Sequence, residues 1–90
     1  MNKQELISQV AETSGLTKAD ASRAVDGVFD AITQSLSSGS EVRLTGFGTF
    51  TTSQRKATTG RNPRTGASIK IPASTQPKFR PGKSLRDAVN

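Results

Sequence analysis

The chain has 90 residues and a net charge of +6, and it contains neither cysteine nor histidine. Without cysteine no disulfide framework can form, and without histidine the commonest general base and metal ligand are missing. The carboxylates are scattered, no apolar run approaches the roughly 20 residues of a membrane span, and the N-terminus lacks the apolar part of a secretory signal. We therefore expect one small intracellular soluble domain with no catalytic residues, no metal and no cofactor.

Charge and apolar residues divide along the chain in opposite ways. Residues 1–50 hold four basic and six acidic side chains, whereas residues 51–90 hold nine basic and one acidic. Residues 1–50 also contain 19 of the 28 hydrophobic residues. The first half should therefore form the core, and the second half has the charge expected of a nucleic-acid or membrane binder. A core this small is marginal for one chain, which favours a homodimer.

Two helices are predicted at the N-terminus. The cap residue and apolar spacing that begin at Asn2 and end at Gly15 predict a helix over 3–14. A second, longer apolar stripe after Thr17 predicts a helix over 18–37. A repressor-type helix-turn-helix would fit this spacing. However, the acidic residues of the second helix would repel phosphate, so we interpret both helices as a scaffold.

Strand patterns follow the helices. Alternation over 41–45 predicts a half-buried strand, and Gly46-Phe47-Gly48 predicts a tight turn or bulge before the next strand begins near Thr49. Pro81-Gly82 should turn the chain into a short C-terminal helix, capped by Gly82 or Ser84. Because large rings dominate burial, we assign the four aromatic residues to a dimer core rather than to base stacking: Phe29, Phe47, Phe50 and Phe79.

Segments 51–61 and 66–78 are polar and long. At about 3.3 Å per residue they extend roughly 35–40 Å, whereas a compact body of this size has a radius of gyration of only ~12 Å. We therefore predict a two-stranded ribbon that projects from the body as an arm. Pro72 and Pro77 cannot donate to a ladder and should keep one edge from pairing further. Such a ribbon is marginal in water, which indicates ordering on a partner.

The stretch Gly60-Arg61-Asn62-Pro63-Arg64-Thr65-Gly66 predicts a turn at the tip of this arm. Asn62 can bond its own backbone two residues on, Pro63 presets the next turn position, and Gly66 can adopt a left-handed conformation. Cations along a ribbon can neutralise successive phosphates, so the expected target is a polyanion.

Two features of the arm have alternative interpretations. Pro63 is apolar, rigid and surrounded by cations, so it can wedge between base pairs and kink a duplex; equally, it can serve only to shape the turn. Ile69 and Ile71 fall on one side of the second arm strand. They either line a groove of the ligand or hold the ribbon together. The sequence pattern alone does not decide either case.

Three motifs, in order, resemble the bacterial histone-like HU and integration host factor family: Gly46-Phe47-Gly48-Thr49-Phe50, the tip sequence, and Phe79-Arg80-Pro81-Gly82-Lys83. The length and the Asp-Ala-Val-Asn ending are more similar to HU. The resemblance implies an α+β fold with a helical hairpin base, a three-stranded antiparallel sheet, a protruding β-ribbon arm, a short C-terminal helix and an intertwined dimer. Residues 1–50 would form the base and first strands, 51–78 the DNA-binding arm, and 79–90 the strand end and last helix.

The resemblance also implies roles for residues. Pro63 would intercalate at each kink. The other residues would contact duplex DNA at the tip (Arg61, Asn62 and Arg64), along the arm (Arg55, Lys56 and Lys70) and on the body (Lys3, Lys78, Arg80, Lys83 and Arg86). Family members bend DNA, package the nucleoid in the cytoplasm and prefer nicked, gapped or kinked duplexes. Position 64 is Arg where many HU members carry Gln, which adds charge at the tip.

The prediction is thus a non-enzymatic architectural protein that binds, bends and condenses DNA with little sequence preference. A homodimer is expected, and a heterodimer with a paralogue stays open. The first alternative is a sequence-specific, integration-host-factor-like protein, which Phe79-Arg80-Pro81-Gly82 also resembles. The second is an RNA-binding or ribosome-associated protein, disfavoured because the arm lacks aromatic residues for base stacking. The third is a protein-interaction scaffold.

Overall fold

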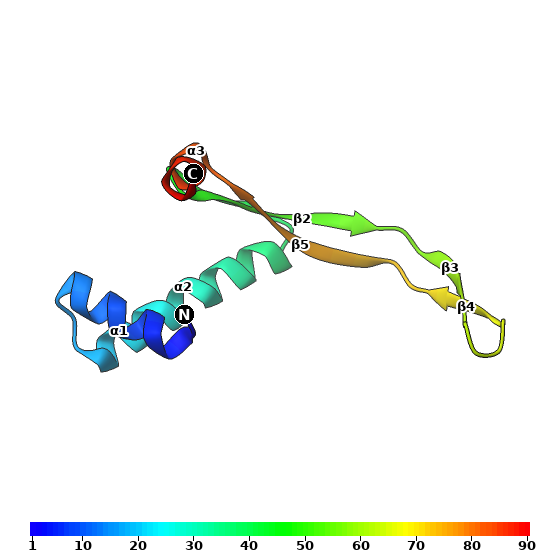
Figure 1. The fold of residues 1–90 in the computed structure, drawn as a ribbon, viewed down its shortest axis with the longest axis horizontal. Coiled ribbons are helices and arrows are strands. Elements are labelled where there is room, and N and C mark those ends of the chain that lie inside the picture. Colours follow the sequence, from blue (N-terminus) through cyan, green and yellow to red (C-terminus); the bar gives the residue numbers. More distant parts are fainter.

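The computed structural model describes residues 1–90 as an elongated α+β chain, with the helical body at one end and a ribbon at the other (Figure 1). The elements run α1 (Lys3–Ser14), α2 (Lys18–Ser37), β1 (Val42–Leu44), β2 (Gly48–Arg55), β3 (Thr58–Arg61), β4 (Ser68–Ile71), β5 (Ser74–Pro81) and α3 (Lys83–Val89). Both predicted N-terminal helices are confirmed with the expected bounds, and β1 is shorter than predicted. None of the helices combines the length and apolar character needed to cross a membrane.

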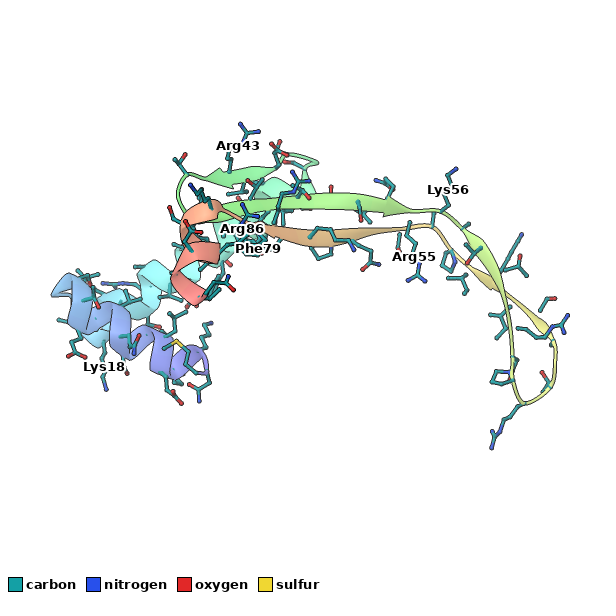
Figure 2. All side chains as sticks on the ribbon, turned by 45° about the horizontal axis from the view of Figure 1, so that its top comes forward. Lys18, Arg43, Arg55, Lys56, Phe79 and Arg86 are labelled. Atoms are coloured by element: carbon teal, nitrogen blue, oxygen red, sulfur yellow. The ribbon has the colours of Figure 1, made fainter.

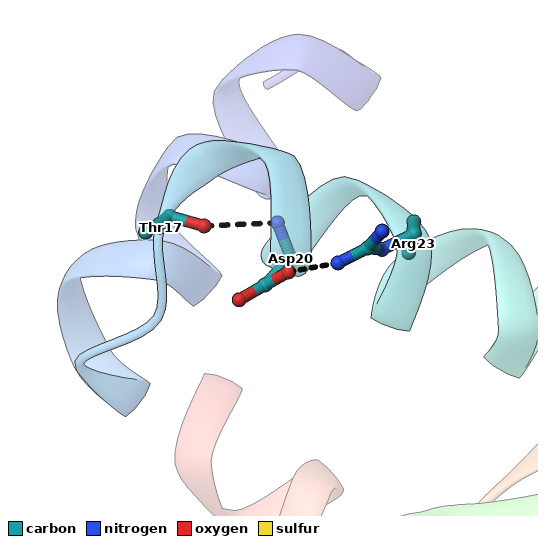
Figure 3. Close-up of polar contacts among 3 residues, drawn as sticks. All are labelled: Thr17, Asp20 and Arg23. Carbon is teal, nitrogen blue, oxygen red and sulfur yellow. Dashed lines mark hydrogen bonds and ion pairs between the residues drawn. The ribbon is translucent and has the colours of Figure 1, made fainter.

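The boundaries of α1 and α2 follow from local capping. The Asn2 side chain accepts a hydrogen bond from the Glu5 N–H at 2.9 Å, and Gly15 ends α1 with a φ of 74°. At α2 the Thr17 hydroxyl accepts from the Asp20 N–H at 3.1 Å (Figure 3). Each cap satisfies a backbone N–H that has no partner inside the helix.

The core of the single chain is small. Only 5 of 90 residues are buried, and the hydrophobic ones lie between α1 and α2: Ile7, Ala11, Ala21 and Val25. The predicted location of the core in the first half is confirmed. Outside this pair of helices, large apolar side chains remain exposed, including 43% of Phe29, 48% of Phe47 and 41% of Phe79.

A three-stranded antiparallel sheet has the order β1-β2-β5. The β1–β2 turn is tight because Gly46 has a φ of 85° and the Phe47 N–H donates to the Leu44 carbonyl at 2.9 Å. The Phe47 carbonyl in turn accepts from the Gly82 N–H at 2.8 Å, which joins this turn to the start of α3. Of the two predicted caps of α3, Gly82 and Ser84, the structure shows Gly82 as the N-cap.

Gly48 is buried where the first and third motifs of the sequence meet. A Cβ on Gly48 would lie 2.6 Å from the Phe79 ring and 2.7 Å from the Arg80 carbonyl oxygen, closer than real Cβ atoms approach other atoms. Only glycine lets β5 pass this closely. The Gly46-Phe47-Gly48 and Phe79-Arg80-Pro81-Gly82 motifs are therefore two halves of one packing arrangement.

The arm projects as predicted, but it is not one continuous ribbon. The β2–β5 ladder ends at the pair Arg55 and Ser74, and a separate β3–β4 ladder begins at Thr58 and Ile71. Pro72 lies in the gap and has no N–H to donate, which accounts for the break. The Cα radius of gyration is 18.7 Å, well above the ~12 Å of a compact chain.

Candidate nucleic-acid interface

The β1-β2-β5 sheet has one apolar side. Paired residues of antiparallel strands share a side, and successive residues alternate. By this register Val42, Phe50 and Phe79 share a side, and the rings of Phe50 and Phe79 lie 4.8 Å apart. Phe47 joins them with its ring centroid 5.5 Å from that of Phe79. Phe29 belongs to α2 and is not in ring contact with this cluster, so the chain unites three of the four predicted core aromatics.

The opposite side of the sheet carries cations and small polar residues, and we call it the cationic side. It consists of four cross-strand rows: Arg43, Thr49 and Arg80; Thr51 and Lys78; Ser53 and Gln76; Arg55 and Ser74. Figure 2 shows Arg43 pointing outward from β1, with Phe79 beneath the sheet. Figure 2 also shows Arg55 and Lys56 pointing to opposite sides of the ribbon, as successive residues of an extended chain do.

The distal ribbon repeats this division. Arg61 and Lys70 share one side of the β3–β4 ladder, and Ile69 and Ile71 share the other. Ile69 is 45% exposed and Ile71 is 38% exposed, although the Ile71 side chain reaches across the glycine at position 60. The ribbon thus offers one cationic and one apolar side to a ligand. Ile71 also contributes to cohesion of the ribbon itself.

The tip turn has the predicted local structure. The Asn62 side chain accepts from the Arg64 N–H at 2.9 Å, and the Gly66 N–H donates to the Asn62 carbonyl at 2.8 Å. Gly66 has a φ of 71°, in the left-handed region. The Asn62 N–H donates to the Ala67 carbonyl at 2.8 Å and closes the loop. These bonds engage the backbone N–H, the backbone carbonyl and the side-chain oxygen of Asn62, and Pro63 is exposed at the apex.

The ion pairs of the chain lie on its body. Lys3 contacts Asp26 at 2.7 Å, Arg43 contacts Glu41 at 3.0 Å, and Arg23 contacts Asp20 (Figure 3). Among the predicted DNA contacts, Lys3 alone is paired. The others have no carboxylate partner: Arg55, Lys56, Arg61, Arg64, Lys70, Lys78, Arg80, Lys83 and Arg86. Their charge is free to attract a polyanion.

The predicted cations fall into groups at different places. Arg61, Arg64 and Lys70 lie together at the far end, and Arg55 and Lys56 lie where the two ladders separate. Lys78 and Arg80 lie on the β5 part of the cationic side. The remaining ones belong to helices of the body: Lys3 in α1, and Lys83 and Arg86 in α3. A ligand that contacts every group must therefore span from the body to the tip.

Sequence reasoning missed Arg43 as a member of the cationic side. It sits in the same cross-strand row as Thr49 and Arg80. The signal was present, because Arg43 alternates with Val42 and Leu44 and therefore occupies the polar side of the strand. The alternation over 41–45 was used to predict the buried side of the strand, and the side chain on its other side was not considered as a DNA contact.

Relatives of known name match the whole chain. DNA-binding protein HRL53 of Rhizobium leguminosarum is 60% identical over 90 residues, covering 100% of this chain and 99% of that protein. DNA-binding protein HU of Geobacillus stearothermophilus is 60% identical over 89 residues, covering 99% of each. The cocrystal structure of Anabaena HU with DNA has a TM-score of 0.92 at 43% identity, covering 99% of this chain and 97% of that chain.

The resemblance to HU drawn from three motifs is confirmed by these matches, and so is the α+β architecture. A model of the family described as bacterial DNA-binding protein matches residues 1–90. That range includes the base, the arm and the last helix. The chain therefore belongs to the bacterial DNA-binding protein family.

Proposed function

We propose that the chain is an architectural protein that binds duplex DNA as a homodimer, with little sequence preference. Its arms enter the minor groove and kink the duplex, and the bent DNA is condensed in the bacterial nucleoid. No enzymatic step is involved. Residues 1–50 form most of the dimer base, and residues 51–78 form the DNA-binding arm.

One observation carries this proposal: the arm has many cations and no acid to neutralise them. Arg55, Lys56, Arg61, Arg64 and Lys70 are exposed and have no ion-pair partner. Cations spaced along a ribbon match the spaced phosphates of a duplex, and each contact releases counterions. The likeness to an HU–DNA cocrystal structure supports duplex DNA as the polyanion.

The dimer follows from apolar surface that one chain leaves exposed. Phe29 of α2, Phe47 of the β1–β2 turn, Phe79 of β5 and Val89 of α3 are between 41% and 75% exposed. Surfaces of this kind mark protein interfaces. A dimer would cover them and place two arms on one duplex. Bending requires both arms, because each holds the DNA on one side of the body.

Pro63 is the proposed wedge. It is exposed at the apex, and the turn keeps its shape through bonds made by Asn62 and Gly66 rather than by Pro63. An apolar ring inserted between base pairs unstacks them for a few kcal/mol and kinks the duplex. Nicked or gapped DNA has already lost stacking, so the protein should bind it more tightly than intact duplex.

The test is a bend measurement by energy transfer between dyes at the two ends of a short duplex. Pro63→Ala should reduce the bend while keeping most of the affinity, because the phosphate contacts remain. Pro77→Ala is the matched control: it removes an exposed proline from the same arm, away from the apex and outside the break between the two ladders. An unchanged bend angle with Pro63→Ala would reject the wedge. Absence of any binding to duplex would reject the proposed function.

A further inference from the structure

The strongest charged feature that the function does not yet use is Arg43, together with its neighbour Glu41. Arg43 is central in β1 and shares a cross-strand row with Thr49 of β2 and Arg80 of β5. Neighbouring strands lie about 4.8 Å apart, so the Cα atoms of the two arginines are separated by about 10 Å across the sheet. Two guanidinium groups at that spacing can reach phosphates on the two sides of a narrow groove.

We propose that Arg43 is a phosphate contact on the body and that Glu41 regulates it by competing for the same guanidinium. This inference rests on the proposed binding of duplex DNA and adds Arg43 of β1 to the predicted contacts on the arm and on β5. The Glu41 carboxylate lies 3.0 Å from a terminal nitrogen of Arg43. Both side chains are exposed, so the pair can open without a large desolvation cost.

Position along the cationic side supports a role in binding. Arg43 extends the series formed by Arg80, Lys78 and Arg55 to the edge strand of the sheet. The small residues between them, such as Thr49 and Thr51, leave these long side chains free to reach outward. Of the three residues of β1, Arg43 is the one on the cationic side, so a duplex that lies over this side would contact β1 through Arg43.

Chemistry distinguishes Arg43 from the other cations of this side. Lys78, Arg80 and Arg55 have no carboxylate partner, whereas Arg43 does. A guanidinium has five N–H donors, so Arg43 can exchange its carboxylate for a phosphate or share its donors between them. In either case the Glu41 charge opposes DNA. Glu41 therefore weakens contact with the body while leaving the arm unaffected.

The experiment measures binding of a duplex to the full-length protein over a series of salt concentrations. Arg43→Ala should lower the slope of log affinity against log salt by about 0.9 for each protomer, the value for one lost phosphate contact. Arg23→Ala is a matched control. Arg23 also pairs with a carboxylate, and its side chain is 79% exposed against 75% for Arg43, but it lies on α2. Both variants change the net charge equally.

Glu41→Gln provides a readout that misfolding cannot imitate. It should raise affinity roughly two- to fivefold for each protomer, because it removes an opposing charge comparable to one exposed ion pair. Equal slopes for Arg43→Ala and Arg23→Ala would overturn the phosphate contact. Unchanged or lower affinity of Glu41→Gln would overturn the competition. Failure of the unaltered protein to bind duplex would instead reject the proposed function itself.

Discussion

The helical body and the arm contain the same kinds of residues, but cations and isoleucines have partners within the chain on the body and remain unpaired or exposed on the arm. On the body, Lys3 and Arg23 are paired with carboxylates, and Ile7 is buried between the helices. On the arm, Arg61 and Lys70 have no carboxylate partner, and Ile69 is exposed. The contacts of these body residues are made within the chain. The arm leaves both its charge and its apolar side for something outside the protein.

Because of this difference, effects on stability and effects on binding should arise from different positions. Substitutions in the core between α1 and α2 should change the free energy of unfolding and leave the salt dependence of binding unchanged. Substitutions in the arm should do the reverse. Matched substitutions at one position in the body and one in the arm, or at a control position, therefore test whether the two effects separate.

The largest expected contrast is between two isoleucines. Ile7 is 6% exposed in the core, whereas Ile69 is 45% exposed on the ribbon. Ile7→Ala should lower the free energy of unfolding by about 2–5 kcal/mol, because it removes buried atoms and leaves a cavity. Ile69→Ala should change it by less than about 0.5 kcal/mol. Denaturant unfolding at one fixed protomer concentration measures both, and equal losses would contradict the contrast.

A second contrast uses two glycines. Gly48→Ala forces a Cβ to within 2.6 Å of the Phe79 ring and 2.7 Å of a backbone oxygen, so unfolding should become easier by about 1–3 kcal/mol. Gly60→Ala meets only the end of a flexible side chain, Ile71 Cδ1, at 3.2 Å. Its cost should be below about 0.5 kcal/mol. Thermal unfolding followed by circular dichroism would reveal the order, and a greater loss at Gly60 would contradict it.

The smallest effect concerns the ion pair of Lys3 with Asp26. Both side chains are at least half exposed, so the pair should contribute little. Asp26→Asn should lower the free energy of unfolding by less than about 1 kcal/mol. The same denaturant measurement checks this, with Asp30→Asn as a control because Asp30 is in no ion pair. A loss of several kcal/mol would mean that the body depends on this charge.

The features that could be predicted from the sequence are those set by residues close together in the chain. The caps at Asn2 and Thr17 and the glycine at position 15 act within one turn of the chain, so helix bounds could be predicted from neighbouring residues alone. The tip turn was predictable for the same reason, since Asn62 and Gly66 make its bonds locally. The projection of the arm was predictable from the length of its two polar segments, which exceeds the size of a compact body.

Contacts between distant segments were not predictable in this way. Gly48 is required by the ring of Phe79, which lies 31 positions further along the chain. Pro72 was expected to protect an outer edge, but it lies where the ladder inside the ribbon is interrupted. Arg43 was missed because its importance depends on the register with Arg80, two strands away.

The most direct test compares salt dependence of duplex binding between two doubly substituted proteins. If about six phosphates are neutralised, affinity of the unaltered protein should fall on the order of 10³ over a fourfold rise in salt. Arg61→Gln with Arg64→Gln should lower the slope by about 1.8 for each protomer. Lys18→Gln with Arg23→Gln makes the same change in net charge on the body and should leave the slope unchanged. Equal slopes in the two proteins would contradict phosphate binding by the cations of the arm.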